Sequence, residues 1–133
     1  MESPLELVTL LRDAIKANWT LMTKAKILHR EVSLNIIMTG SEAHKNRKGY
    51  VIDLDLAVLL TGGKYQEKIE AMTGKMEFMA LEVMSDGFET YGAVVEHLYR
   101  HDLESFFYVF LWQCLSCGWE YEENLKNEYL KKW

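Results

Sequence analysis

The sequence has little of several features that would define its class at once. In 133 residues it has one proline and only two cysteines, Cys114 and Cys117. A single C-x-x-C pair at the end of an apolar stretch builds neither a disulfide framework, a thioredoxin-like redox site nor a four-ligand zinc site. We expect both cysteines to be reduced, small apolar side chains of an intracellular protein, in the cytoplasm or nucleus. His44, His97 and His101 share no helical spacing with carboxylates or cysteines, so no metal site is predicted.

Basic charge and long apolar runs are also scarce. The 15 Lys and Arg residues stand against 20 Asp and Glu residues, and the net charge of -5 disfavours a nucleic-acid partner. The longest apolar run, residues 106–115, is interrupted by Gln113 and is too short to cross a bilayer. Residues 1–4 offer neither the basic nor the apolar region of a secretory signal. The sequence therefore predicts a protein without a nucleic-acid or membrane partner.

What the sequence does contain begins with a helix signal. Ser3 precedes Pro4, and Glu6 follows three residues after Ser3, which is the pattern of an N-cap with a capping box. Apolar residues then recur at helical spacing and predict one long helix that ends near Lys24. These residues are Leu7, Leu10, Leu11, Ala14, Leu21, Met22, Ala25 and Leu28.

The middle of the chain predicts a small β-hairpin. Two short apolar segments, residues 35–38 and 50–53, flank a polar loop that contains glycine. Residues 61–77 lack clear periodicity and predict a long irregular loop, whereas residues 78–84 predict a short helix.

The last third of the chain predicts two further helices. A helix from Asp102 is apolar nearly all round, with Phe106, Phe107 and Phe110, which is typical of a central helix buried in the core. Residues 119–133 alternate charged and apolar residues and predict an amphipathic last helix. We therefore expect a mainly α fold with a small β-hairpin, in one domain that spans residues 1–133.

Four short segments follow one another in a characteristic order. They are residues 27–33 around His29-Arg30-Glu31, 49–57 around Asp53, 73–82 ending in Ala80-Leu81-Glu82, and 99–109 around Asp102. In this order and spacing the chain resembles the C-terminal lobe of the fungal-type protein kinases over nearly its whole length. The resemblance implies a C-lobe-like fold and a family that transfers phosphoryl groups from Mg-ATP to protein serine or threonine.

The resemblance also shows where the transfer chemistry is altered. Glu31 stands at the catalytic Asp position, and its extra methylene moves the carboxylate in a site that tolerates little misplacement. Ile36 stands at the position of the magnesium-binding Asn and offers no oxygen. Its neighbour Asn35 cannot substitute on a strand-like stretch, where successive side chains point to opposite faces. Asp53 keeps the position of the magnesium-binding Asp, although an Asp that begins a turn after a strand would look the same.

Other matched positions have structural roles in kinases. His29 braces the catalytic loop, and Arg30 is the arginine of the His-Arg-Asp motif. Asp102 accepts backbone hydrogen bonds from that loop and can also cap its own helix. Glu82 matches the Glu of Ala-Pro-Glu, whose usual partner is an arginine in a late helix, and the sequence shows no evident partner. Lys75 replaces the threonine that binds the catalytic Asp, so it is either a solvated lysine or an ion-pair partner of the acid.

The groups that grip ATP from the N-terminal lobe are missing from these residues. There is no Gly-x-Gly-x-x-Gly and no strand with a Val-Ala-Ile-Lys-like lysine, and the residues before the catalytic segment predict one helix. We therefore expect a C-lobe without its N-lobe that does not bind Mg-ATP productively. The apolar surface that the N-lobe would cover, on the first helix and the hairpin, is expected to favour self-association.

Three functions remain open at this point. The chain is a truncated, catalytically impaired, pseudokinase-like fragment, or an active kinase whose N-lobe is missing from the gene model, or a non-catalytic protein-binding or regulatory module. The altered Glu31 and Ile36 favour the first. Its substrate and its protein partner are not specified by the sequence.

Overall fold

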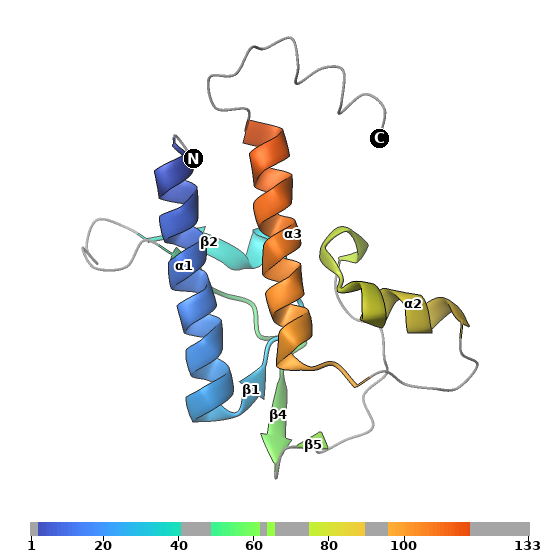
Figure 1. Ribbon diagram of the computed structural model, residues 1–133. Coiled ribbons are helices and arrows are strands. Elements are labelled where there is room, and N and C mark those ends of the chain that lie inside the picture. Colours follow the sequence, from blue (N-terminus) through green and yellow to red (C-terminus); the bar gives the residue numbers. More distant parts are fainter. Residues whose placement is uncertain (1–2, 41–48, 62–63, 66–74, 90–95, 118–133) are drawn as a thin grey trace.

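A computed structural model describes residues 3–40, 49–61, 64–65, 75–89 and 96–117. The chain is mainly helical and carries small antiparallel sheets, as Figure 1 shows. Helices α1 (Pro4–Thr20) and α3 (Tyr99–Cys117) are the longest elements, and their apolar faces meet in the core. The expectation of a mainly α protein with a hairpin is confirmed.

Helix α1 forms as its sequence predicts. Ser3 has an extended backbone, and its hydroxyl oxygen accepts a hydrogen bond from the N–H of Glu6 at 3.2 Å. This bond satisfies one of the N–H groups that a helix start leaves unpaired. The helix continues as a π-helical turn, Leu21–Ala25, and stops at Lys26, whose φ is 56°. The predicted end near Lys24 is therefore confirmed.

The predicted hairpin is present, one or two residues from the expected positions. Strand β2 (Ile37–Thr39) pairs antiparallel with β3 (Gly49–Val51), and Thr39 lies opposite Gly49. A Cβ at Gly49 would overlap the backbone carbonyl of Leu10, so this glycine allows β3 to lie directly against α1.

The sequence did not predict the second sheet. Strand β1 (Ile27–Leu28) pairs with β4 (Val58–Thr61), which pairs in turn with β5 (Lys64–Tyr65). These strands have two to four residues, which is too short for alternation to stand out in a sequence. Part of the expected irregular loop 61–77 is therefore strand.

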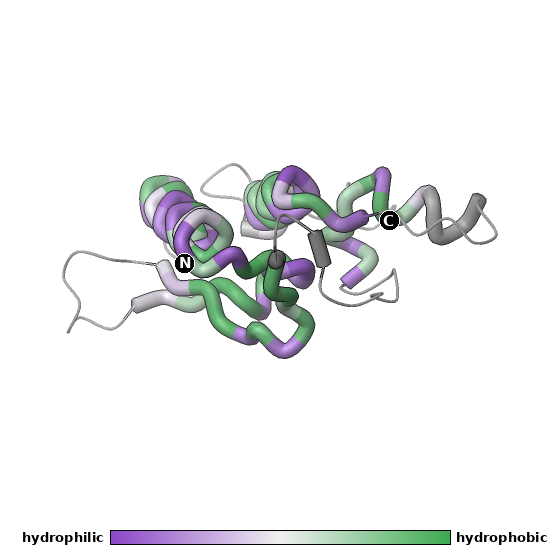
Figure 2. Tube along the Cα trace, turned by 90° about the horizontal axis from the view of Figure 1, so that it is seen from below, coloured by the Kyte–Doolittle hydropathy of each residue, from purple (hydrophilic) through white to green (hydrophobic). Residues whose placement is uncertain are grey.

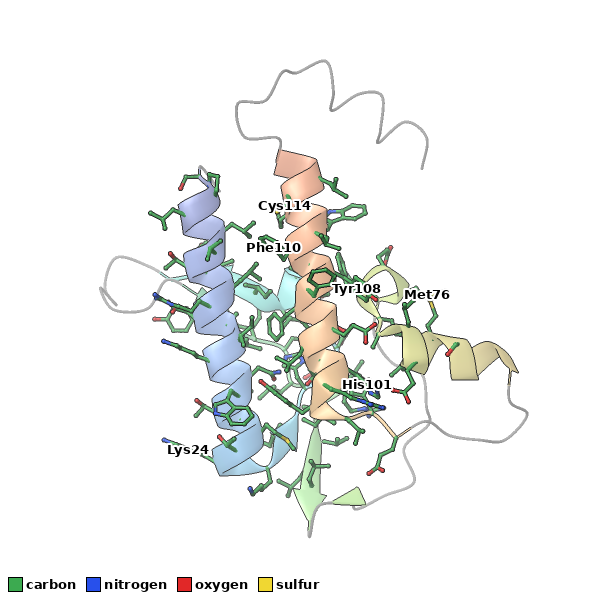
Figure 3. The ribbon with its side chains drawn as sticks, in the orientation of Figure 1. Lys24, Met76, His101, Tyr108, Phe110 and Cys114 are labelled. Carbon is green, nitrogen blue, oxygen red and sulfur yellow. The ribbon has the colours of Figure 1, made fainter. Side chains whose placement is uncertain are left out.

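Helix α3 begins three residues before Asp102 and packs against α1 by one face only. Phe106 and Val109 are buried in the cluster that includes Leu7, Leu11 and Ala14 of α1. Phe110 and Cys114 also lie against this cluster, on the part of α3 labelled in Figure 3. The Cys114 side chain is partly buried, and the side chain of Cys117 lies outside the described residues.

The prediction that α3 is buried all round is wrong. Its other face is exposed: the Phe107 side chain, expected in the core, is 54% accessible. Figure 2 shows hydrophobic and hydrophilic residues following one another around the coils of both long helices. We call the exposed apolar face the α3 stripe; it consists of Leu103, Phe107, Leu111 and Leu115.

Helix α2 (Leu81–Glu89) lies near the N-terminal half of α3. A short 3-10 turn, Met76–Phe78, precedes it in the chain. The Phe78 ring meets the Trp112 ring edge-on at 6.1 Å, which ties this turn to α3. The expected helix 78–84 is thus confirmed in type but begins at Leu81. The amphipathic helix predicted for residues 119–133 lies outside the described residues.

No helix in the described ranges is both long and apolar enough to cross a membrane.

Candidate functional site

The His29–Glu31 turn follows β1 and is held by one carboxylate from α3. Asp102 is fully buried; its Oδ2 accepts the N–H of His29 at 3.2 Å, and its Oδ1 accepts the N–H of Arg30 at 3.1 Å. Hydrogen bonds to an ionised acceptor are stronger than neutral ones, and these two join residues more than seventy positions apart. The backbone hydrogen bonds expected of Asp102 are therefore present.

The His29 ring connects this turn to the end of β3. The ring is fully buried, and its Nδ1 accepts the N–H of Glu31 at 3.4 Å. Because Nδ1 accepts, the hydrogen of the neutral ring is on Nε2, which donates to the carbonyl oxygen of Ile52 at 3.1 Å. The backbone N–H of Glu31 and the backbone carbonyl of Ile52, the residue before Asp53, thus bind to the same imidazole.

Two non-glycine residues of the site have left-handed backbones. The φ angles are 70° at Arg30 and 62° at Asp53, and such conformations cost about 1–2 kcal/mol in residues with a Cβ. Arg30 is also buried, and its Nη1 donates to the carbonyl oxygen of Leu56 at 3.5 Å. The surrounding contacts stabilise two strained turns at the positions where the sequence suggested catalytic and metal-binding groups.

The two candidate carboxylates remain accessible. The Glu31 side chain is half-buried and Asp53 is exposed, with Asp53 Oδ1 accepting the N–H of Asp55 at 3.4 Å. Lys75 is exposed, and neither Lys75 nor the Glu31 side chain forms an ion pair among the described residues. The structure therefore supports the interpretation of Lys75 as a solvated lysine.

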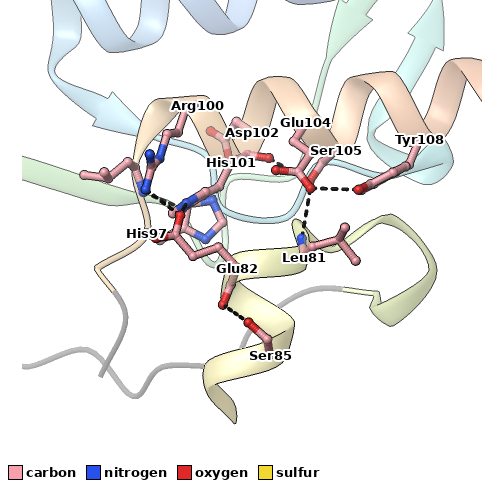
Figure 4. Close-up of polar contacts among 11 residues, drawn as sticks. Leu81, Glu82, Ser85, His97, Arg100, His101, Asp102, Glu104, Ser105 and Tyr108 are labelled. Atoms are coloured by element: carbon pink, nitrogen blue, oxygen red, sulfur yellow. Dashed lines mark hydrogen bonds and ion pairs between the residues drawn. The ribbon is translucent and has the colours of Figure 1, made fainter. Parts of the chain in front are cut away.

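Glu82 does have a partner, so the expectation that it lacks one is wrong. Its Oε2 accepts hydrogen bonds from Nη2 of Arg100 at 2.5 Å and from Nε2 of His101 at 2.7 Å, drawn in Figure 4. The bond from His101, together with the charge of Arg100, holds the pKa of the Glu82 carboxyl below its ordinary value, against an opposing effect of desolvation. The partners lie at the start of α3 and not in a late helix.

A second carboxylate reaches from α3 back to α2. Glu104 Oε1 accepts the N–H of Leu81, the first residue of α2, at 2.9 Å, and the hydroxyl of Tyr108 at 2.7 Å. An acceptor at a helix N-terminus satisfies an otherwise unpaired N–H group. The hydrogen bond to Glu104 raises the pKa of the Tyr108 hydroxyl. The start of α2 is therefore bound to α3 by two carboxylates, Glu82 from α2 and Glu104 from α3.

The sequence reasoning missed His97 and His101. His97 Nε2 lies 2.9 Å from Asp102 Oδ1, and its ring meets the His101 ring edge-on at 5.3 Å. Both rings are buried. Metal-ligand spacing does not reveal their role, because each of them binds a carboxylate. The available signal is the density of polar residues at the start of an apolar helix, at residues 100–105.

A comparison with known protein families identifies the family of the chain. The family model described as fungal protein kinase matches residues 1–114. The chain belongs to the fungal protein kinase family. No curated protein matches the sequence.

In this fungal protein kinase family member, Ile36, which the resemblance places at the position of the magnesium-binding Asn, is part of the core. The Ile36 side chain is 2% accessible and belongs to the same cluster as Leu7 and Phe106. Asn35 is exposed on a 3-10 turn, Leu34–Ile36, and not on a strand, so the alternation argument against it does not apply. The Ile36 side chain contains no oxygen and is buried away from solvent.

Metal-binding groups are sparse in the described ranges. No cluster of three or more His, Cys, Asp or Glu side chains that could hold a metal ion occurs there. Asp53, which the family resemblance places at a magnesium position, is exposed, and its role as a magnesium ligand stays a prediction.

Proposed function

We propose that these residues form a kinase C-lobe-like region in which phosphoryl transfer is impaired. The buried Ile36 carries this proposal: the magnesium-binding Asn of the family is replaced by a residue that packs into the core. Metal contacts supply much of the charge stabilisation in phosphoryl transfer. The longer Glu31 at the position of the catalytic Asp acts in the same direction.

The C-lobe-like interpretation rests on the order and contacts of the elements. A long helix, a His-Arg-acid turn, a hairpin that ends before an Asp, and a helix with Asp102 in its first turn follow one another. Asp102 ties the last of these elements to the second. The 133 residues contain no Gly-x-Gly-x-x-Gly and no Val-Ala-Ile-Lys-like segment, so the groups that bind the ATP phosphates would have to be supplied from outside them.

Mg-ATP is expected to leave the melting temperature of the chain unchanged. A ligand that binds only the folded state at one hundred times its Kd stabilises it by about 2.7 kcal/mol, which a thermal shift detects readily. The measurement compares Mg-ATP with Mg²⁺ alone, ATP alone and the Asp53→Asn variant. A rise in Tm that needs both Mg²⁺ and Asp53 would contradict impaired binding and favour an active kinase. Autophosphorylation of the isolated chain, followed with labelled ATP, would do the same.

The exposed α3 stripe favours one further candidate, a non-catalytic protein-binding module. Contiguous exposed apolar side chains on soluble proteins often mark interfaces. This candidate agrees with an absent nucleotide response, and the solution behaviour predicted below bears on it.

A further inference from the structure

A continuous set of side-chain contacts runs from α2 to the turn that carries Glu31. Glu82 binds His101, the His101 ring contacts the His97 ring, and His97 binds Asp102. Asp102 then accepts the N–H groups of His29 and Arg30. Figure 4 shows the Glu82, His97 and His101 side chains converging at the start of α3.

The direction of every hydrogen bond in this set is determined. Leu98 donates its N–H to His101 Nδ1 at 3.0 Å, so the ring hydrogen is on Nε2 and is donated to Glu82. The Asp102 carboxylate can only accept, so His97 donates through Nε2. Neither ring can flip without breaking its bond to a carboxylate and, for His101, the bond from Leu98 as well.

The set is also packed tightly enough to transmit a displacement. His101 is 1% accessible and His97 is 7% accessible, and their planes are nearly perpendicular at 89°. In a close-packed interior, a ring that moves displaces the ring whose edge or face it contacts. A shift of the Glu82 carboxylate therefore acts on Asp102 through two rings.

We propose that His97 and His101 are positioning residues that couple the 75–82 segment to the His29–Glu31 turn. The inference rests on the proposed function in one respect, namely that Glu31 lies at the position of the catalytic acid in a kinase C-lobe-like region. On that basis, a protein segment that docks beside residues 75–82 changes the order of the turn at the position of the catalytic acid. The Glu104 bond to Leu81 supports this coupling, because it fixes the backbone next to Glu82 to α3.

Amide hydrogen exchange of the labelled chain tests the coupling at His29 and Arg30. Glu82→Ala is expected to speed exchange of both amides at least about threefold, since their shared acceptor loses part of its support. The amides of Leu11 and Ala14 in α1 should exchange as before, which excludes general unfolding. Glu82→Gln retains an acceptor oxygen and should restore most of the protection. Glu77→Ala, an exposed acid of the same segment without a partner among the described residues, is the matched control.

A double-mutant cycle decides whether the effect passes through the rings. His97→Phe keeps the ring contact and removes the donor to Asp102, so Glu82→Ala should add nothing to the exchange rates in that background. His97→Gln keeps a donor but removes the ring that contacts His101, so it should also abolish the response to Glu82→Ala. It therefore serves as the second variant if His97→Phe does not fold. Fully additive effects of Glu82→Ala and His97→Phe, or equal acceleration by Glu82→Ala and Glu77→Ala, would overturn the proposal.

The outcome is independent of nucleotide binding. A thermal response to Mg-ATP would overturn impaired transfer while leaving the exchange data unaffected. Unchanged exchange at His29 and Arg30 in Glu82→Ala would overturn the coupling even if Mg-ATP has no effect.

Discussion

Ile36 is a core residue at the position where the family resemblance predicts a metal ligand. Its side chain is part of the cluster between α1 and α3. An asparagine there would bring an amide into apolar surroundings, where an unpaired polar group is costly. The change from the family pattern is therefore supported by the packing around it.

Ile36→Asn is expected to lower the free energy of unfolding by about 3–5 kcal/mol, because it removes a buried aliphatic side chain and buries an amide. Urea denaturation followed by circular dichroism measures this change. Asn35→Ala, at the exposed neighbouring position, is the control and should alter stability by less than about 0.5 kcal/mol. A fully stable Ile36→Asn variant would mean that the site can accept a ligand residue after all.

The contacts of the Glu82 carboxyl lower its pKa. His101 first, and Arg100 after it, favour the charged form and hold its pKa below the ordinary value of 4.5. A carboxyl with a lower pKa in the folded state stabilises the fold above the ordinary value. That contribution is lost as the pH falls through the lower, folded-state pKa.

A carbon-detected NMR titration should therefore give Glu82 a midpoint below 4.5. In His101→Gln, which loses the imidazole Nε2–H, the midpoint should move back toward the ordinary value. A midpoint at or above 4.5 in the unmodified chain would show that the hydrogen bond to His101 does not persist in solution.

At the scale of single elements, the contact between α1 and β3 depends on one missing side chain. Gly49 lies against the Leu10 carbonyl, where a Cβ would overlap it. The hairpin therefore cannot move closer to α1, and it moves away if residue 49 gains a methyl group.

Gly49→Ala is expected to lower the free energy of unfolding by about 1–3 kcal/mol, the usual cost of overpacking. Thr39→Ala, at the exposed residue directly opposite on β2, is the matched control and should cost less than about 1 kcal/mol. Both are measured by urea denaturation. Equal effects would indicate that strand propensity and not the contact with α1 determines the result.

The elements that the sequence predicted are those with a strong local signal. The cap at Ser3 and the spacing of Leu7, Leu11 and Ala14 predicted α1, and the polar loop between apolar segments predicted β2 and β3. Strands β1, β4 and β5 were missed because strands this short are stabilised by pairing with distant residues rather than by local pattern.

In the candidate site, too, some contacts could be predicted from the sequence and others could not. The Asp102 hydrogen bonds followed from the family resemblance, because four matched segments placed the acid and its loop together. The bonds of Glu82 to Arg100 and His101 did not follow, since they depend on how α2 meets α3 and not on a sequence spacing. The exposure of Phe107 was missed because an apolar helix has the same sequence whether one face or all faces are covered.

At the scale of the molecule, the α3 stripe is a row of exposed apolar side chains within the described residues. Its members follow one another every four residues along a helix whose opposite face forms the core. The sequence had placed the exposed apolar surface on the first helix and the hairpin, and the stripe adds a further area on α3.

The isolated chain is expected to self-associate, with two copies covering each other's stripe. Light scattering coupled to size exclusion should show a mass that rises with concentration. Replacing Phe107 and Leu111 by Gln should shift the chain toward monomer, whereas Leu5→Gln, at an exposed residue of α1, should not. A monodisperse monomer at all concentrations would contradict this expectation.

The bonds from Asp102 also set an order of events during synthesis of the chain. They join Asp102 to residues 72 and 73 positions earlier, so a loop of that length must close before the His29–Arg30 turn gains its acceptor. At about 5–20 residues per second, the ribosome needs roughly 4–14 seconds to make the intervening chain. Helix α1 can form during this interval, whereas the turn at the catalytic position stays without its carboxylate until the start of α3 has emerged.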